Sequence, residues 1–254
     1  MVETIHPGTS APGARIAVFD FDGTVSLIRA GWVEIMVSMM LEVLTALHTG
    51  ESQDDLRGVV EPSIWRLTGK ETLYQMIALA EQVTLRGGTP LDPREYKRQF
   101  LSRLFAVSGR RIQELHDHRC APDQYLVPGT RALLGDLRAR GLRLYLASGT
   151  DEAHVKEEAD LLDVTRYFDG GVYGALPDPD AFSKRMLIER ILRRPGIHPH
   201  HLIGFGDGPV EIEELKRAGA LAVGLATDEP DYIIPNYLCR PVLLPMLFFN
   251  HEPI

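Results

Sequence analysis

Cysteine, excess positive charge and long apolar runs are all scarce in this chain of 254 residues. Only two cysteines occur, Cys120 and Cys239, and they lack the spacing of a metal-ligand or redox pair, which favours ordinary thiols in a reducing compartment. The net charge of −8 leaves no basic footprint for nucleic acid or for an anionic membrane. An acidic chain that binds an anion must therefore gather positive charge locally.

The sequence also lacks a recognisable membrane span or signal peptide. The most apolar stretch, Val242–Phe249, is too short to cross a bilayer and contains Pro245. Residues 1–14 contain no apolar segment of the kind that signal peptides have. We therefore expect a soluble cytoplasmic protein, a monomer or weak dimer with no nucleic-acid or membrane partner.

Four short apolar runs share one design: each ends in small or acidic residues and is followed by a helical pattern. They cover Ile16–Phe19, Leu142–Ala147, Leu202–Phe205 and Leu221–Ala226. Runs of this length, bounded by glycine and polar residues, are typical of buried parallel strands. The alternation predicts an α/β fold with a Rossmann-like parallel sheet and helices on both faces. Ligands of such sheets bind beyond the carboxyl ends of the strands, where the polar clusters lie.

A long segment between the first two runs has a different character. Residues 32–115 show mostly helical periodicity and no convincing strand. This segment is predicted to form an inserted α-helical cap above the sheet. We therefore predict a core domain of residues 1–28 and 118–254 and a cap domain of residues 29–117.

The clearest chemical signal is Asp20-Phe-Asp22, directly after the first run. Positions two apart at the end of a strand point the same way, so both carboxylates can reach one pocket. Two carboxylates so close repel each other unless a cation lies between them or one of them holds a proton. One can then act as a nucleophile while the other exchanges a proton, and Mg²⁺ prefers such oxygen ligands. A structural turn rich in Asp and Gly would look the same, so the motif alone leaves both interpretations open.

Further polar clusters follow the later runs or open a helix. Asp207 lies between two glycines, and Glu211 follows four residues later, which puts both carboxylates on one side of a helix start. The segment Ser148-Gly149-Thr150 precedes a helix, where hydroxyl and N–H groups suit a phosphate oxygen, although a plain helix cap is equally consistent. Lys184 opens another helical pattern, where a cation is unfavourable unless a negative group compensates it.

In this order the motifs resemble the haloacid dehalogenase superfamily, and most closely its phosphoglycolate phosphatase and β-phosphoglucomutase group. The resemblance covers about residues 15–226. It implies a phosphatase that hydrolyses a small phosphorylated metabolite, with Asp20 as the nucleophile that forms an aspartyl-phosphate and Asp22 as the general acid/base. Relatives that do not cleave phosphate esters lack the second Asp, so Asp22 favours phosphate esters.

The resemblance also implies how the phosphoryl group is held. It assigns phosphate binding to Ser148, Gly149 and Lys184. In the cap, Lys70 lies in a loop placed like the one that brings a basic residue over the substrate in phosphoglucomutase-like relatives. We therefore expect Lys70 to recognise the substrate, although an exposed lysine beside a helix start would look the same.

A magnesium site is the remaining implication of the resemblance. It assigns the metal to Asp20, to the backbone carbonyl of Asp22 and to Asp207. Glu211 stands where most relatives have Asp, so it is predicted either to bind the metal or to support its ligands. Two other functions stay open: a phosphomutase that uses the same residues, and a non-catalytic signalling protein that carries phospho-Asp.

Two segments do not fit this scheme. The histidines of His198-Pro-His-His201 precede the strand that leads to Asp207, so they are predicted to form a surface turn far from that residue. Near the C-terminus, only Thr227–Pro230 separates the fourth run from the strand-like Asp231–Pro235. A parallel crossover needs about a dozen residues, so either this segment runs differently or a stretch present in relatives is missing.

Overall fold

The computed structural model of the chain describes residues 3–4, 9–178, 181–225, 232–233 and 247. Its sheet has seven strands in the order β1-β7-β6-β5-β2-β3-β4. The strands are β1 (Glu3–Thr4), β2 (Ile16–Phe19), β3 (Arg143–Asp151), β4 (Gly171–Ala175), β5 (Leu202–Gly206), β6 (Leu221–Gly224) and β7 (Tyr232–Ile233). The pairs from β7 to β4 are parallel, whereas β1 pairs antiparallel with β7. The predicted parallel sheet is confirmed.

The middle of the sheet fixes where the polar motifs lie. Strand β2 pairs with β3 on one side and with β5 on the other. Phe19, the last residue of β2, is in register with Leu146 and with Phe205. The residues that follow these positions therefore leave the sheet at the same edge, which brings Asp20, Ser148 and Asp207 near one another although they are far apart in sequence.

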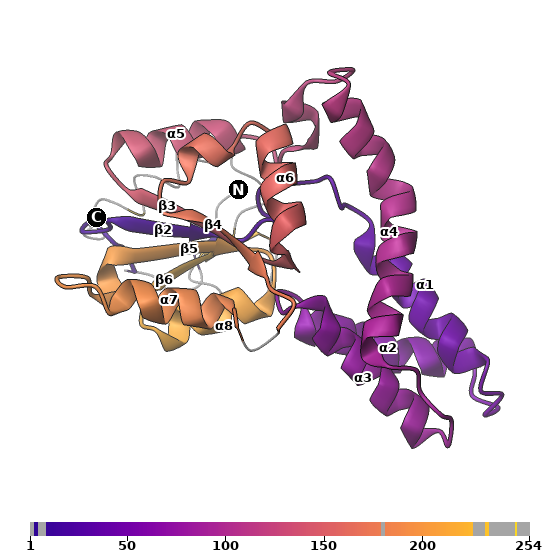
Figure 1. The fold of residues 1–254 in the computed structure, drawn as a ribbon. Helices are drawn as coiled ribbons and strands as arrows, with labels where there is room; N and C mark the ends of the chain where they lie inside the picture. Colours follow the sequence, from indigo (N-terminus) through magenta and orange to yellow (C-terminus); the bar gives the residue numbers. More distant parts are fainter. Residues whose placement is uncertain (1–2, 5–8, 179–180, 226–231, 234–246, 248–254) are drawn as a thin grey trace.

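Helices cover both faces of the sheet, because its apolar residues alternate between two cores. Ala17 and Phe19 belong to the core on one side, and Ile16 and Val18 to the core on the other. The first core contains side chains of α5 (Thr130–Ala139) and α6 (Glu152–Leu161), and the second those of α7 (Lys184–Leu192) and α8 (Pro209–Arg217). Figure 1 shows α5 above the sheet and α7 and α8 below it.

The segment between β2 and β3 contains the long helices α1 (Trp32–Thr45), α2 (Gln53–Leu67), α3 (Thr72–Leu85) and α4 (Pro93–His116). A short 3₁₀ turn, η1 (Pro122–Tyr125), follows α4 in the same segment, and η2 (Thr165–Tyr167) and η3 (Pro199–His201) occur later in the chain. Helices α1–α4 bury a separate apolar cluster and lie together at one end of the sheet (Figure 1). They reach the rest of the molecule through contacts of α2 with α8 and of α4 with α6. The predicted helical insert is confirmed.

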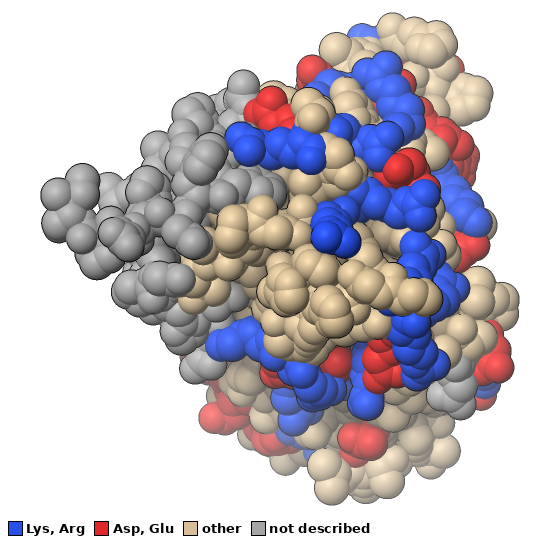
Figure 2. Space-filling model, turned by 90° about the vertical axis from the view of Figure 1, so that its left-hand side faces the viewer, with Lys and Arg blue, Asp and Glu red and all other residues tan. Residues whose placement is uncertain are grey.

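The starts of the strands lie at the opposite end. Arg15 accepts a backbone hydrogen bond from Arg143 and donates one to His201, at 2.8 and 2.9 Å, so the three residues form a row. Figure 2 shows the side turned away from α1–α4, where Lys and Arg side chains surround an uncharged area. His198 and His200 are exposed as predicted for a surface turn, whereas His201 is buried. The Nδ1 of His201 accepts the N–H of His198 at 3.1 Å. This histidine turn and the acidic motifs occupy opposite ends of the sheet.

The segments near the C-terminus are only partly described. Among the described residues, no helix has the length and apolar character needed to span a membrane. Cys239, Thr227–Pro230 and most of Val242–Phe249 lie outside the described residues. Strand β7 nevertheless pairs in parallel with β6 with only residues 225–231 between them, so the expectation of about a dozen connecting residues is wrong for this pair.

Candidate active site

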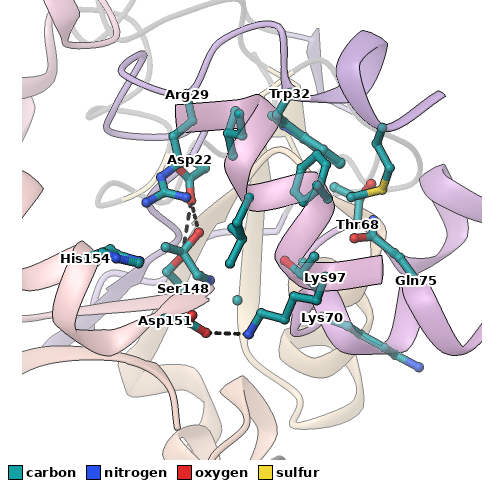
Figure 3. Close-up of a pocket in the computed structure, with 18 of the residues that line it drawn as sticks. Asp22, Arg29, Trp32, Thr68, Lys70, Gln75, Lys97, Ser148, Asp151 and His154 are labelled. Carbon is teal, nitrogen blue, oxygen red and sulfur yellow. Dashed lines mark hydrogen bonds and ion pairs between the residues drawn. The ribbon is translucent and has the colours of Figure 1, made fainter. Parts of the chain in front are cut away.

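A pocket lies between the ends of β2, β3 and β5 and the helices of the insert (Figure 3). From the sheet side it is lined by Asp20, Asp22, Asp207 and the segment 148–151. From the helical side it is lined by residues of α1, α3 and α4 and by the turn of residues 68–70. The structure thus brings the acidic, hydroxyl and glycine motifs to one place.

Lys184 joins two of the acidic residues. It is the first residue of α7, and its Nζ lies 2.7 Å from Oδ1 of Asp20 and 2.9 Å from Oε2 of Glu211. All three side chains are buried. These carboxylates supply the compensation that a cation at a helix start requires, and they raise the pKa of Lys184 despite its burial, so it stays charged.

The acidic group is arranged as a cation site would be. Asp20, Asp207 and Glu211 each offer a carboxylate oxygen, and these oxygens lie within 4.8 Å of one another. Burial and the neighbouring carboxylates raise the pKa of Asp207 well above its ordinary value, which a cation between the carboxylates would reverse. A Cβ at Gly23 would lie 2.0 Å from Oδ2 of Asp207, so only glycine lets this carboxylate approach the loop after β2.

Glu211 uses both of its oxygens within the protein. Its Oε1 accepts the backbone N–H of Gly208 at 2.6 Å, and its Oε2 accepts from Lys184. The first bond satisfies an N–H at the start of α8 (Pro209–Arg217). Glu211 therefore ties that helix start to Lys184.

Asp22 points to the hydroxyl groups at the end of β3. Its Oδ2 accepts from Oγ1 of Thr150 at 2.7 Å and from Oγ of Ser148 at 3.4 Å. Its Oδ1 is buried without a hydrogen-bond partner among the described residues, and the nearest cation is Nε of Arg29 at 3.8 Å. Burial raises the pKa of Asp22, although Arg29 opposes the shift, and this favours the protonated form.

Arg29 lies behind Asp22, in the chain that leads to α1. Its guanidinium donates to Glu158 of α6, with Nη2 2.6 Å from Oε1, and both side chains are buried. It also lies 5.4 Å from the ring centroid of Phe105 in α4. Arg29 therefore connects the loop after β2, a helix on the sheet and a helix of the insert. Burial and Arg29 lower the pKa of the neighbouring His154.

Lys97 of α4 forms a second ionic group at the lower edge of the pocket in Figure 3. Its Nζ lies 2.7 Å from Oε1 of Glu71 and 2.7 Å from Oδ1 of Asp151. Asp151 is the last residue of β3, whereas Glu71 caps α3. The ammonium thus holds the helical insert against the sheet side of the pocket.

Lys70 reaches the pocket through its main chain. Its carbonyl oxygen lies 2.4 Å from where a Cβ on Gly149 would be, so the turn of residues 68–70 packs directly on the glycine between Ser148 and Thr150. The Lys70 side chain is exposed, and its Nζ lies 5.8 Å from the ring centroid of Tyr74. Figure 3 shows this side chain directed away from Asp22, while Lys97 extends to Asp151.

Sequence reasoning missed several of these residues. The predicted site did not include Arg29, Lys97, Asp151, His154 or Glu158. A signal existed for Glu158, because Val155 and Ala159 mark the buried stripe of α6 and a charged residue between them falls on the same face. Lys97 gave no such signal, since a lysine on a helix is usually solvated.

Proteins of known family resemble this chain in both sequence and fold. The sequence profile of the family described as haloacid dehalogenase-like hydrolase matches residues 14–219. A phosphoglycolate phosphatase from Shigella boydii is 30% identical over 259 residues, covering 94% of this chain and 94% of that protein. The resemblance inferred from the motifs is confirmed.

Two solved structures illustrate the likeness in fold. A haloacid dehalogenase-like hydrolase from Streptococcus pneumoniae has a TM-score of 0.59 at 19% identity and covers 91% of this chain and 99% of its own. A β-phosphoglucomutase from Clostridium difficile has a TM-score of 0.55 at 13% identity, covering 88% of this chain and 92% of its own. At these identities the likeness establishes the arrangement of the chain.

Proposed function

Because the chain belongs to the haloacid dehalogenase-like hydrolase family and is a phosphatase, we propose that it hydrolyses a small phosphorylated metabolite through an aspartyl-phosphate on Asp20. The observation that carries this proposal is the contact of Asp20 with Lys184, at 2.7 Å, inside an acidic group that includes Asp207. The proposed nucleophile Asp20, the ammonium of Lys184 and the carboxylate oxygens that can bind a metal then lie together at the end of β2.

Mg²⁺ fits this group because its ligands are oxygens and the carboxylates have pKa values raised by mutual repulsion and burial. We propose that Asp20, Asp207 and the backbone carbonyl of Asp22 hold the ion, which when bound neutralises charge on the transferring phosphoryl group. Both oxygens of Glu211 already accept hydrogen bonds, so in this proposal Glu211 holds Lys184 and adds its charge to the site.

In the first step, a carboxylate oxygen of Asp20 forms a bond to phosphorus while the bond from phosphorus to the ester oxygen breaks. Asp22 gives its proton to the leaving oxygen, which the raised pKa of its buried carboxyl makes available. Lys184, the Ser148 hydroxyl and the Gly149 backbone N–H stabilise the negative oxygens of the phosphoryl group.

In the second step, the aspartyl-phosphate is hydrolysed. Asp22 is now a carboxylate, so it can take a proton from a water molecule as the water oxygen attacks phosphorus. The bond from phosphorus to the Asp20 oxygen breaks, which releases inorganic phosphate and restores both residues to their starting states.

We further propose that residues 29–117 act as a cap domain that excludes bulk water from the acyl-phosphate. The close packing of Lys70 on Gly149 and the ion pair of Lys97 with Asp151 support this role, because both join the insert to the reactive edge of the sheet. A capped pocket admits a small metabolite and excludes a phosphoprotein. A cytoplasmic location and a monomer or weak dimer remain part of this proposal.

The test is turnover of a panel of phosphomonoesters, including phosphoglycolate, by the purified protein with and without metal. We expect activity with Mg²⁺, its loss in excess chelator and its return when Mg²⁺ is restored. Ca²⁺ in place of Mg²⁺ should lower kcat by roughly tenfold or more, since its larger shell of 6–8 oxygens spoils the in-line geometry. Full activity in excess chelator would contradict the metal assignment, and turnover of no ester would contradict the phosphatase.

A further inference from the structure

Part of the helical side of the pocket is an apolar wall. It is formed by side chains of α1 and α4, namely Trp32, Met36, Phe100, Leu101 and Leu104. Met36, Phe100 and Leu104 are only 1–3% exposed, so they belong to the core of the insert as well as to the pocket. Water beside such a wall has few hydrogen-bond partners, and displacing it with an apolar group is favourable.

The cations that line the pocket near this wall are either paired or turned away. The exposed side chain of Lys70 is directed away from Asp22 (Figure 3). Lys97 is held by Glu71 and Asp151, so this group of three charges is negative overall. Arg29 is held by Glu158. A second negative charge on the substrate would therefore meet an ammonium that two carboxylates already neutralise, and it would be repelled by the excess carboxylate.

The polar side chains on the same side are turned towards the insert itself. The Thr68 hydroxyl donates to the carbonyl of Ile64 at 3.1 Å, and the Gln75 amide donates to the same carbonyl at 3.4 Å. Both side chains are buried. A sugar hydroxyl that accepted from the Thr68 hydroxyl would have to displace the bond to Ile64.

We propose that this wall binds the organic part of the substrate and that the enzyme prefers phosphate esters of apolar alcohols. Small aliphatic or aromatic esters should be better substrates than phosphorylated sugars or phosphorylated hydroxy acids. The inference rests on the proposed function, because it concerns the leaving group of the same reaction. It adds the class of substrate, which neither the acidic motifs nor the family specifies.

The experiment is a series of methyl, propyl and pentyl phosphate, with glycerol 1-phosphate and phosphoglycolate as polar comparators, assayed with Mg²⁺. The alkyl esters differ mainly in the length of the apolar chain, so the chemical step changes little along the series. Each methylene group that becomes buried should raise kcat/KM about fourfold, which corresponds to about 0.8 kcal/mol. Propyl phosphate should exceed both polar comparators.

A matched pair of variants locates the effect. Leu101→Asn changes a half-buried residue of the wall and should reduce the dependence on chain length. Leu85→Asn changes a leucine at the end of α3 that is 77% exposed, and it should leave the series unchanged. The inhibition constant of inorganic phosphate should be the same in both variants, which checks that the phosphate subsite is intact. If Leu101→Asn does not fold, Leu101→Ala removes contact area without adding a polar group and should also flatten the series.

The wild-type series alone can overturn the inference. A flat or falling kcat/KM from methyl to pentyl phosphate, or a polar comparator that exceeds propyl phosphate, would refute it while leaving the phosphatase intact. An unchanged series in a folded Leu101→Asn would refute the assignment to this wall. Turnover of none of these esters would instead count against the proposed function, and the inference would fall with it.

Discussion

The two walls of the pocket differ in almost every physical respect. The sheet side carries buried charge, with Asp20, Lys184 and Glu211 in direct contact. The helical side includes the apolar wall of α1 and α4 and holds the ammonium of Lys97 between two carboxylates. In the proposed function, the sheet side binds the phosphoryl group that reacts. The helical side contacts the organic part of the substrate and selects it by shape and polarity.

This difference separates chemistry from specificity within one cavity. Removing a charge from the sheet side leaves its partners buried and uncompensated, which is costly for both stability and catalysis. Changing an apolar residue on the helical side alters the apolar area that the substrate buries, which changes kcat/KM by a few factors of about ten at most. The predictions below start with the first kind of change and end with the smallest perturbation of the second.

The largest effect is expected from Asp20→Asn, which removes the proposed nucleophile but keeps the shape of the side chain. Turnover should fall by at least about a thousandfold, because an amide cannot form the phosphorylated intermediate. Glu213→Gln, at an exposed position of α8, is the matched control and should retain activity. Activity above a few per cent in a variant that unfolds at the wild-type temperature would remove Asp20 from its role.

A smaller effect is expected behind the charged wall, at Glu158. Burial raises its pKa to about 7 from an ordinary value of 4.5, although Arg29 opposes the shift. Between these values the folded state holds a proton that the unfolded state has lost, so this group makes the free energy of unfolding fall as pH rises. Over this window the loss amounts to at most about 3 kcal/mol.

Glu158→Gln cannot titrate, so its free energy of unfolding should depend less steeply on pH than that of the wild type. Denaturant unfolding between about pH 4.5 and 7.5, without metal, measures the difference. Asp160 on the same helix is exposed, and Asp160→Asn should keep the wild-type slope. Equal slopes in all three proteins would mean that Arg29 keeps Glu158 ionised throughout.

The smallest effect is expected at Lys70, whose role in substrate recognition stays a prediction. Its ammonium lies beside the Tyr74 ring, a contact worth about 0.5–1 kcal/mol at an exposed site, and losing it should loosen the turn that packs on Gly149. Lys70→Ala should lower kcat/KM about two- to fivefold for the preferred ester and less for p-nitrophenyl phosphate, which needs little from the cap. Equal losses on both esters would remove Lys70 from recognition, and a loss above about tenfold on the preferred ester would show that its ammonium reaches the substrate.

The same contrast explains what the sequence could predict. The sheet-side wall consists of short motifs at strand ends, and parallel strands bring their ends together, so Asp20, Ser148 and Asp207 could be assigned to one site before any coordinates. The apolar wall could not be found in this way. Phe100 and Leu104 sit at ordinary helical spacing, and the periodicity that predicts a buried face does not say which buried residues border a cavity.

The strands that were missed are short or separated from any apolar run. Strand β4 contains two glycines in five residues, Gly171 and Gly174, so its composition is that of a loop. It forms because Tyr145, Leu146 and Ala147 of β3 provide an open edge in register with it. The neighbouring strand β3 decides this pairing, so the sequence of β4 alone does not predict a strand there.

The contact of Lys70 with Gly149 has a consequence for how this protein can change over time. The turn of residues 68–70 contacts the sheet side through its main chain, because the carbonyl of Lys70 occupies the space that a side chain at position 149 would need. A contact made by the backbone does not depend on which side chains the helical insert carries. In the proposed cap, side-chain substitutions can therefore change the substrate preference while this backbone contact is kept, provided that residue 149 remains glycine.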